Sequence, residues 1–234
     1  MATRALDLSK KTHYRRFAGR PKPDPARVQA ILKLLDEHYP NATCALRYET
    51  PFQLLIATIL SAQTTDEVVN KVTPQLFARY PDAEHLARAR QEDVEKIIRS
   101  TGFYRNKAKN IIAAAKMIHE EFGDELPRDI DTFVKIPGAA RKTANVVLGT
   151  AFGIASGVVV DTHVARVTRR WHFHDLKDPV KIEKVLMVLL PRDRWISFSH
   201  QVIWHGRRLC MAKKPKCDVC PFLPHCPEGQ KNVP

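Results

Sequence analysis

Apolar residues recur at helical spacing along most of this 234-residue chain, and that periodicity constrains its fold more than any other feature. Only the three valines within residues 157–160 favour extended backbone, and one short strand cannot form a sheet. The connections are short and carry Pro or Gly, as expected between packed helices. We therefore predict an all-α fold. The predicted helices lie in residues 25–40, 51–60, 94–98, 108–118, 143–152, 180–190 and 195–209.

The charge balance points to a polyanionic partner. Lys and Arg outnumber Asp and Glu by 38 to 25, which gives a pI near 9.7. Such a surface attracts nucleic acid, although a basic enzyme of no special kind remains the alternative. No apolar run reaches the roughly 18 residues of a membrane span, so we expect no membrane partner. Residues 1–24 are basic and lack the apolar segment of a secretory signal, which predicts a flexible arm and leaves organelle or nuclear targeting open.

A cysteine cluster near the C-terminus indicates a metal centre. It comprises Cys210, Cys217, Cys220 and Cys226, with six, two and five intervening residues. One tight cluster in a chain without a secretory signal favours metal over disulfides, and Cys44 stands apart from it. Four thiolates can hold zinc or an iron–sulfur cluster, and the single C-x-x-C with a wide first gap favours iron–sulfur. Lys213 and Lys214 lie inside that gap, where a bound metal would present them to a nucleic-acid backbone.

The sequence IPGAA separates two predicted helices and has the composition of a phosphate-binding turn. Pro137 and Gly138 supply the turn, and its N–H groups with the positive end of the next helix can bind an anion. An ordinary helix–turn–helix corner is the commoner interpretation of such a turn. Lys142 follows beside Arg141, where the helix dipole and the neighbouring cation disfavour an ammonium and make a nucleophilic amine accessible. A solvated phosphate-binding lysine is the commoner interpretation of Lys142.

Asp161 stands between an apolar run and a predicted helix. Such an aspartate is most often an N-cap. The same position sets a carboxylate at the edge of the core, where it could act as a base or stabilise positive charge. His163, two residues further on, could line the same cleft or satisfy a core hydrogen bond, and the second role is commoner for a histidine.

Together, IPGAARKTANVV, VDTH and the six-two-five cysteine spacing resemble the endonuclease III family of DNA glycosylases, within the helix-hairpin-helix superfamily. The resemblance covers about Arg27 to Cys226. It implies a two-domain, all-α helix-hairpin-helix glycosylase fold with a C-terminal iron–sulfur cluster loop. The expected parts are a flexible arm (1–24), a discontinuous cluster domain (25–43 plus 156–234) and a six-helix barrel domain (44–155), with DNA bound between the two domains.

The resemblance also assigns roles to individual residues. Lys142 matches the family's catalytic lysine and Asp161 its catalytic aspartate, while the four clustered cysteines match the ligands of a [4Fe-4S] cluster. Gln63 matches the residue that fills the gap left by a flipped nucleotide. Asp66 matches an acid that lines the base pocket, to which we add His163. The residues expected to contact DNA are Gln63, Phe103, Pro137, Gly138, Ala140, Arg141, Lys213 and Lys214.

Two of these positions depart from the family pattern. Phe103 occupies a wedge position where an aliphatic side chain is common. Ala140 replaces the second glycine of the usual G-x-G hairpin, and alanine would be strained there if the position required a positive φ. We expect helical backbone at Ala140, in which case the alanine costs little.

The resemblance implies a bifunctional glycosylase and abasic-site lyase acting on oxidised pyrimidines or abasic sites in double-stranded DNA. Lys142 argues against an adenine-removing glycosylase, which normally lacks it, and Lys142 with Asp161 argues against a non-catalytic DNA-binding protein. Pyrimidine-dimer and mismatch-thymine glycosylases stay open, because they can keep the same residues. We expect a monomer, acting in the cytoplasm at the nucleoid if the source is bacterial.

Overall fold

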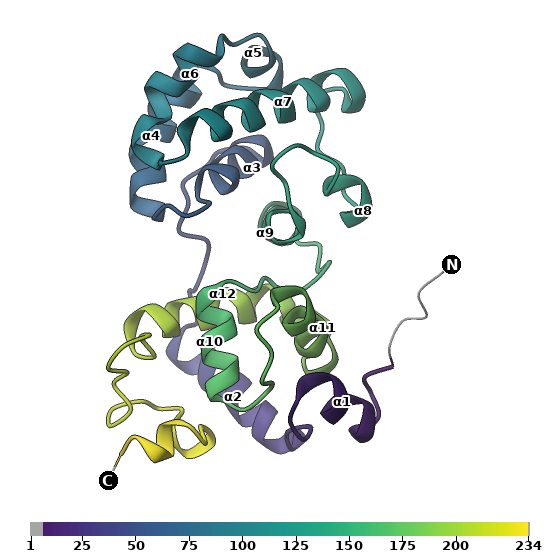
Figure 1. Cartoon of the computed structure of the whole chain (residues 1–234), viewed down its shortest axis with the longest axis vertical. Coiled ribbons are helices and arrows are strands. Elements are labelled where there is room, and N and C mark those ends of the chain that lie inside the picture. The colour runs from purple at the N-terminus through teal and green to yellow at the C-terminus, as the bar shows by residue number, and fades with distance from the viewer. Residues whose placement is uncertain (1–6, 234) are drawn as a thin grey trace. The chain divides into compact units, whose positions relative to one another are not determined.

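The computed structural model describes residues 7–233 as two compact all-helical units, each containing its own hydrophobic core. One unit is the contiguous segment Cys44–Ser156, and the other combines the chain up to Thr43 with the chain from Gly157 onward (Figure 1). The expected boundary lay one residue earlier, at 155. No β-strand occurs in residues 7–233. The possible strand at residues 157–160 is therefore wrong: the segment is buried and extended, but it has no strand to pair with.

The contiguous unit, which we call the barrel unit, is organised around one apolar helix. Every residue from Phe52 to Leu60 is buried, in agreement with a sequence that is apolar on all sides. This helix, α3, packs against α4, α7 and α9. The helices of the barrel unit are α3 (Pro51–Leu60), α4 (Asp66–Arg79), α5 (Ala83–Ala87), α6 (Gln91–Ile98), α7 (Tyr104–Phe122), α8 (Ile130–Phe133) and α9 (Arg141–Phe152), with a 3-10 turn η1 (Arg99–Thr101) before α7.

The second unit, which we call the cluster unit, brings both ends of the chain together. Its helices are α1 (Lys11–Ala18), α2 (Pro25–His38), α10 (Thr162–Arg170), α11 (Pro179–Leu189) and α12 (Trp195–Arg208), with the 3-10 turns η2 (Arg192–Arg194), η3 (Leu223–His225) and η4 (Gly229–Lys231). Helix α12 packs on α2 and α10. Trp171 is fully buried and lies 5.3 Å from the ring of Phe222, so the last turns of the chain complete this core.

The basic N-terminal segment is folded over most of its described length, so the prediction of a flexible arm is wrong for residues 7–24. Helix α1 packs against α11, with Tyr14 fully buried and its hydroxyl donating to the Phe173 carbonyl. The Asp175 N–H donates to the Ala18 carbonyl at 2.8 Å, and Arg20 forms an ion pair with the Asp175 carboxylate at 2.6 Å. The predicted arm's first six residues lie outside the described chain.

Within residues 7–233, no helix is both long enough and apolar enough to cross a membrane.

Candidate active site and cysteine pocket

The turn between α8 and α9 requires glycine at one position for two reasons. Gly138 has a φ of +79°, which a residue with a side chain rarely adopts. A Cβ added there would also lie 3.2 Å from Asn110 Cβ on α7 and 3.2 Å from Ile59 Cγ2 on α3. The turn is therefore packed tightly onto the barrel, and its backbone is held in one conformation.

Ala140 is the N-cap residue of α9 and carries no backbone strain. Its φ of −64° and ψ of 167° are extended, so the expectation of helical backbone is wrong, although the inference that alanine costs little holds. Alanine makes no side-chain capping bond. Ala140 therefore supplies no side-chain acceptor to the start of α9, and an anion is a ligand that suits a helix N-terminus.

Lys142 is the second residue of α9 and is exposed, whereas Thr143, Ala144 and Asn145 after it are buried. The helix thus turns its next three residues into the barrel core and leaves the lysine side chain at the surface. Arg141, half-buried, opens the same turn. An exposed amine and a helix end without a side-chain cap therefore belong to the same helix.

Asp161 opens α10 in the cluster unit. Its Oδ1 accepts a hydrogen bond from the Val164 N–H at 2.8 Å, so the N-cap interpretation is confirmed. Its other carboxylate oxygen accepts no hydrogen bond from the described part of the chain. The cap fixes the half-buried carboxyl group against the helix end and leaves one oxygen for a second role.

His163 is half-buried on the first turn of α10 and has a partner within the protein. Arg166 Nη2 lies 3.1 Å from His163 Nδ1, which assigns the ring proton to Nε2. Burial lowers the pKa of His163, although the Asp161 carboxylate opposes that shift. The ring is therefore a neutral donor through Nε2, and its Nδ1 satisfies the intramolecular hydrogen bond that the sequence suggested.

Gln63 and Phe103 lie on two loops of the barrel unit and share an unusual backbone conformation. Gln63 follows α3 with a φ of +53°, and Phe103 precedes α7 with a φ of +47°. Such values are uncommon for residues with large side chains and concentrate at functional sites. Both side chains are exposed, and Phe103 at 69% is the most exposed of the large apolar residues described. Asp66 is half-buried at the start of α4, two residues after Thr64.

A buried lysine that the sequence did not single out joins these two loops. Lys107 is 5% exposed, and its Nζ donates to Thr64 Oγ1 at 2.8 Å and to the Thr101 carbonyl at 2.7 Å. The Thr64 hydroxyl donates to the same carbonyl. The sequence TGFYRNKA does not indicate that Lys107 is buried, because the acceptors of its hydrogen bonds, Thr64 and Thr101, lie on other elements.

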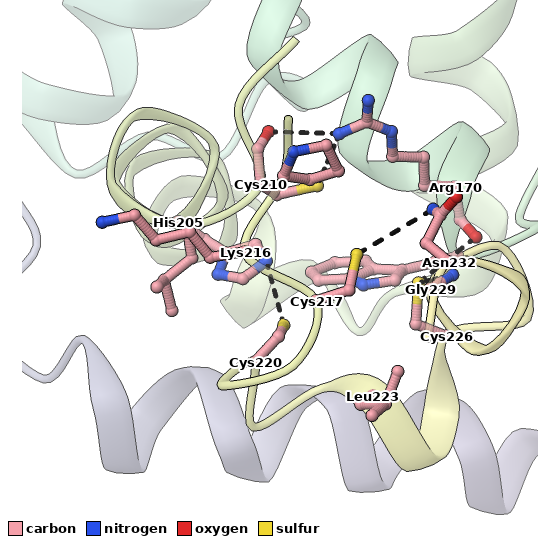
Figure 2. A pocket seen from close by; sticks show the side chains of 13 residues that line it. Arg170, His205, Cys210, Lys216, Cys217, Cys220, Leu223, Cys226, Gly229 and Asn232 are labelled. Atoms are coloured by element: carbon pink, nitrogen blue, oxygen red, sulfur yellow. Dashed lines mark hydrogen bonds between the residues drawn. The ribbon is translucent and has the colours of Figure 1, made fainter. Parts of the chain in front are cut away.

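The four clustered cysteines line one pocket of the cluster unit, together with Arg170, His205, Gly229 and Asn232 (Figure 2). None of the four forms a disulfide. The pocket encloses about 350 Å³ that protein atoms do not fill, including the part that opens to solvent. In residues 7–233, no three His, Cys, Asp or Glu side chains are arranged to hold a single metal ion. The four cysteines therefore face one common space.

Each of the four sulfurs lies near a nitrogen that can donate to it. The pairs are Arg170 Nη1 with Cys210 Sγ at 3.1 Å, Gly229 N with Cys226 Sγ at 3.2 Å, His205 Nε2 with Cys220 Sγ at 3.9 Å, and Asn232 Nδ2 with Cys217 Sγ at 3.9 Å. The Tyr39 hydroxyl lies 2.9 Å from His205 Nδ1, which directs the Nε2 proton toward sulfur. Donors of this kind stabilise ligated thiolates, so the residues fit a thiolate-bound cofactor.

Burial has the opposite effect on the thiols themselves. It raises the pKa of Cys220 to about 11 and also raises the pKa of Cys226. At neutral pH these groups are therefore protonated until a cation replaces the proton. A Cβ at Gly229 would lie 3.2 Å from Cys226 Sγ, so a larger residue there would crowd this sulfur.

The loop between the first two cysteines is held by Arg170. This residue donates to the Met211 carbonyl at 2.7 Å and to the Ala212 carbonyl at 3.1 Å, and the Lys216 N–H donates to the Leu209 carbonyl at 3.0 Å. Lys213 and Lys214 are exposed on this loop. Two cations thus project from a backbone that is fixed at both ends.

The fold and the site define a class of protein, and comparison with known proteins identifies it. Residues 56–192 match the HhH-GPD family, described as "HhH-GPD superfamily base excision DNA repair protein". A trapped endonuclease III–DNA covalent intermediate superimposes with a TM-score of 0.85 at 41% identity, over 90% of this chain and 99% of that one. A thermostable thymine-DNA glycosylase has the same fold, with a TM-score of 0.80 at 21% identity. The class is that of the helix-hairpin-helix DNA glycosylases of base excision repair.

Curated relatives narrow the class to one family. Endonuclease III of Synechocystis sp. is 53% identical over 204 residues, which span 87% of this chain and 93% of that protein. Endonuclease III of Bacillus subtilis is 45% identical over 205 residues, with the same coverage. The chain belongs to the endonuclease III family and is a DNA N-glycosylase with abasic-site lyase activity. The resemblance inferred from the motifs is confirmed, and the alternative of a non-catalytic DNA-binding protein is wrong.

Proposed function

We propose that this glycosylase removes oxidised pyrimidines from duplex DNA and cleaves the resulting abasic site by β-elimination through a Schiff base on Lys142. The exposure of Lys142 on the first turn of α9, beside a helix end without a capping side chain, carries the proposal. A DNA phosphate bound at that helix end would bring the deoxyribose next to the amine. Pro137, Gly138, Ala140 and Arg141 would form this phosphate site.

The proposed reaction begins with a nucleotide flipped out of the duplex, which is easier for a damaged base that stacks poorly. The neutral Lys142 amine attacks C1′, and the bond from C1′ to the base breaks with its electron pair leaving on the base. The ionised Asp161 oxygen that is not used for capping would stabilise positive charge developing on the sugar and would then take a proton from the newly attached amine. The C1′–O4′ bond then breaks as O4′ receives a proton, which gives the Schiff base. Loss of a C2′ proton follows, and the bond to the 3′ phosphate breaks with its electron pair leaving on the phosphate.

The two loops of the barrel unit supply the proposed duplex contacts. Gln63 would fill the gap left by the flipped nucleotide, and Phe103 would wedge between bases, which suits a ring that is 69% exposed. Asp66 and His163 would line the base pocket, where the neutral His163 offers an Nε2 donor.

The four cysteines would hold a [4Fe-4S] cluster. The nitrogen donors around the sulfurs suit ligated thiolates, and the single C-x-x-C with its wide first gap supports iron–sulfur over zinc. When bound, the cluster supplies a structural cross-link, and we propose no redox step for it. Lys213 and Lys214 would then contact the DNA backbone as a fixed pair.

Borohydride reduction tests the proposed Schiff base on Lys142, because it traps such an intermediate as a covalent protein–DNA adduct. We expect an adduct between the wild-type protein and an abasic duplex, and none with Lys142→Ala. A wild-type protein without an adduct, or an undiminished adduct in the variant, would overturn the proposal. A panel of defined lesions separates oxidised pyrimidines from pyrimidine dimers and mismatched thymine.

The cluster and the oligomeric state have their own tests. Iron in the protein with absorbance near about 400 nm is expected of a thiolate-bound cluster. Zinc without iron would overturn that assignment. We propose a monomer, which light scattering of the protein with and without DNA would test.

A further inference from the structure

Lys107 is a buried cation whose partners are all neutral. Its side chain is 5% exposed, and no carboxylate in residues 7–233 pairs with it. Burial lowers the pKa of Lys107, because the charged form loses its hydration. Burying an ammonium without an opposite charge costs free energy that hydrogen bonds only partly offset, so a lysine at this position needs an explanation. The positions of its hydrogen-bond acceptors suggest a structural role for Lys107.

The two acceptors of Lys107 belong to the two loops that carry Gln63 and Phe103. Thr64 directly follows Gln63, and Thr101 precedes Phe103 by two residues. The Thr64 hydroxyl also donates to the Thr101 carbonyl, so the three groups form one closed network between the loops. Thr101 and Lys107 are buried, whereas the side chains of Gln63 and Phe103 are exposed.

The loop conformations show what the network holds in place. Gln63 and Phe103 both have positive φ, and Gly102 between Thr101 and Phe103 has a φ of +67°. Conformations of this kind persist in residues with large side chains only when the surrounding structure enforces them. The contacts of Lys107 fall within two residues of both strained positions.

We propose that Lys107 is a positioning residue that joins the Gln63 and Phe103 loops into one rigid element, so that both side chains enter the duplex together at the lesion. This inference rests on the proposed function, which gives those two side chains their roles in DNA. Lys107 itself does not touch the substrate in this proposal. Its loss would impair the opening of a duplex more than the chemistry at Lys142.

The test compares Lys107→Met, which keeps the side-chain length and removes the donors, with Lys116→Met, which removes an exposed lysine from the same helix. Base unstacking is read from 2-aminopurine placed beside an uncleavable abasic analogue in a duplex. Cleavage is read in single turnover on an abasic site, once in a duplex and once in a single strand, which needs no flipping. Thermal unfolding of each variant is followed in parallel.

We expect Lys107→Met to lose most of the fluorescence rise and to cleave the duplex at least about tenfold more slowly, with single-strand cleavage and Lys116→Met within about twofold of wild type. In the wild type, Gln63→Ala and Phe103→Ala should have non-additive effects on unstacking, and Lys107→Met should make them additive. Thr64→Val, which removes the bridging hydroxyl and leaves the lysine in place, should reproduce the unstacking defect if Lys107→Met does not fold.

An equal loss on duplex and single strand, or unchanged unstacking in both Lys107→Met and Thr64→Val, would overturn the proposal. The fluorescence assay needs no reaction. A wild-type protein that unstacks the duplex in a Lys107-dependent way but forms no borohydride adduct would therefore support this inference and overturn the proposed lyase chemistry.

Discussion

The guanidinium of Arg170 donates to the Cys210 sulfur at 3.1 Å and to the Met211 carbonyl at 2.7 Å, so one side chain fixes both a proposed ligand and the loop after it. A hydrogen bond from a charged donor is worth about 1.5–3 kcal/mol. Arg170→Met should therefore loosen the loop and expose the cysteines. We expect faster loss of iron to a chelator, measured as iron per chain over time. Arg169→Met, at the exposed neighbour, should lose iron at the wild-type rate, and equal loss in both would contradict the prediction.

Gly138 and Ala140 form a matched pair for the phosphate turn. Gly138→Ala combines a positive φ with contacts at 3.2 Å, and we expect it to destabilise the barrel unit by about 2 kcal/mol and to weaken duplex binding. Ala140→Gly should change stability by only a few tenths of a kcal/mol, because the backbone there is extended and unstrained. Denaturant unfolding and binding to an uncleavable abasic duplex measure both effects. Similar losses in the two variants would mean that the turn conformation is not set by Gly138.

Asp161 has a capping role and a proposed chemical role, and two substitutions separate them. Asparagine caps a helix as well as aspartate does, so Asp161→Asn should keep the free energy of unfolding and lower single-turnover glycosylase activity by about 100-fold or more. Asp161→Ala should lose the same activity and about 1 kcal/mol of stability. A fully active Asp161→Asn would assign the residue to capping alone.

His174 makes the stability of the cluster unit depend on pH. It is fully buried, accepts from the Leu176 N–H at 3.1 Å and lies 2.9 Å from Thr168 Oγ1, so the neutral ring is the one that fits. Burial lowers the pKa of His174 to about 4, from 6.5 in the unfolded chain. The unfolded state thus binds more protons between these values. The stabilisation is complete above about pH 6.5 and is lost as the pH falls toward 4.

The expected loss from His174 between pH 7.5 and pH 5 is about 2 kcal/mol. His174→Asn cannot titrate, so its unfolding free energy should fall by that much less over the same range, whatever its absolute stability. Burial also lowers the pKa of His205 to about 4, so the unfolding free energy of the variant still depends on pH in part. Denaturant titrations of both proteins at the two pH values measure the difference. Parallel pH profiles would show that His174 does not contribute.

Features set by neighbouring residues could be predicted from the sequence. The apolar periods of α2, α3, α7 and α12 located those helices, because burial of one face follows from spacing alone. The capping role of Asp161 and the turn at Gly138 followed from local backbone chemistry in the same way. The valines at 158–160 misled the prediction, since burial rather than strand pairing explains them.

Features set by distant partners could not be predicted. Lys107 and Thr64 are 43 residues apart, and Arg170 and Cys210 are 40 apart, so no local pattern marks either bond. Helix α1 was missed for the same reason. Tyr14 is buried and its hydroxyl donates to the distant Phe173 carbonyl, whereas the basic residues around it predicted a flexible, solvated segment. Which lysine is buried and which arginine holds a loop depends on tertiary packing.

The discontinuous cluster unit imposes an order on synthesis of the chain. The barrel unit is complete once Ser156 has left the ribosome, and domains fold as units during translation. The other unit must wait, because Arg27 near the start of the chain donates to the His225 carbonyl at 3.0 Å near its end. Closure of the cluster unit is therefore a post-translational event, and a product truncated before Cys226 would contain a finished barrel unit but an incomplete cluster unit.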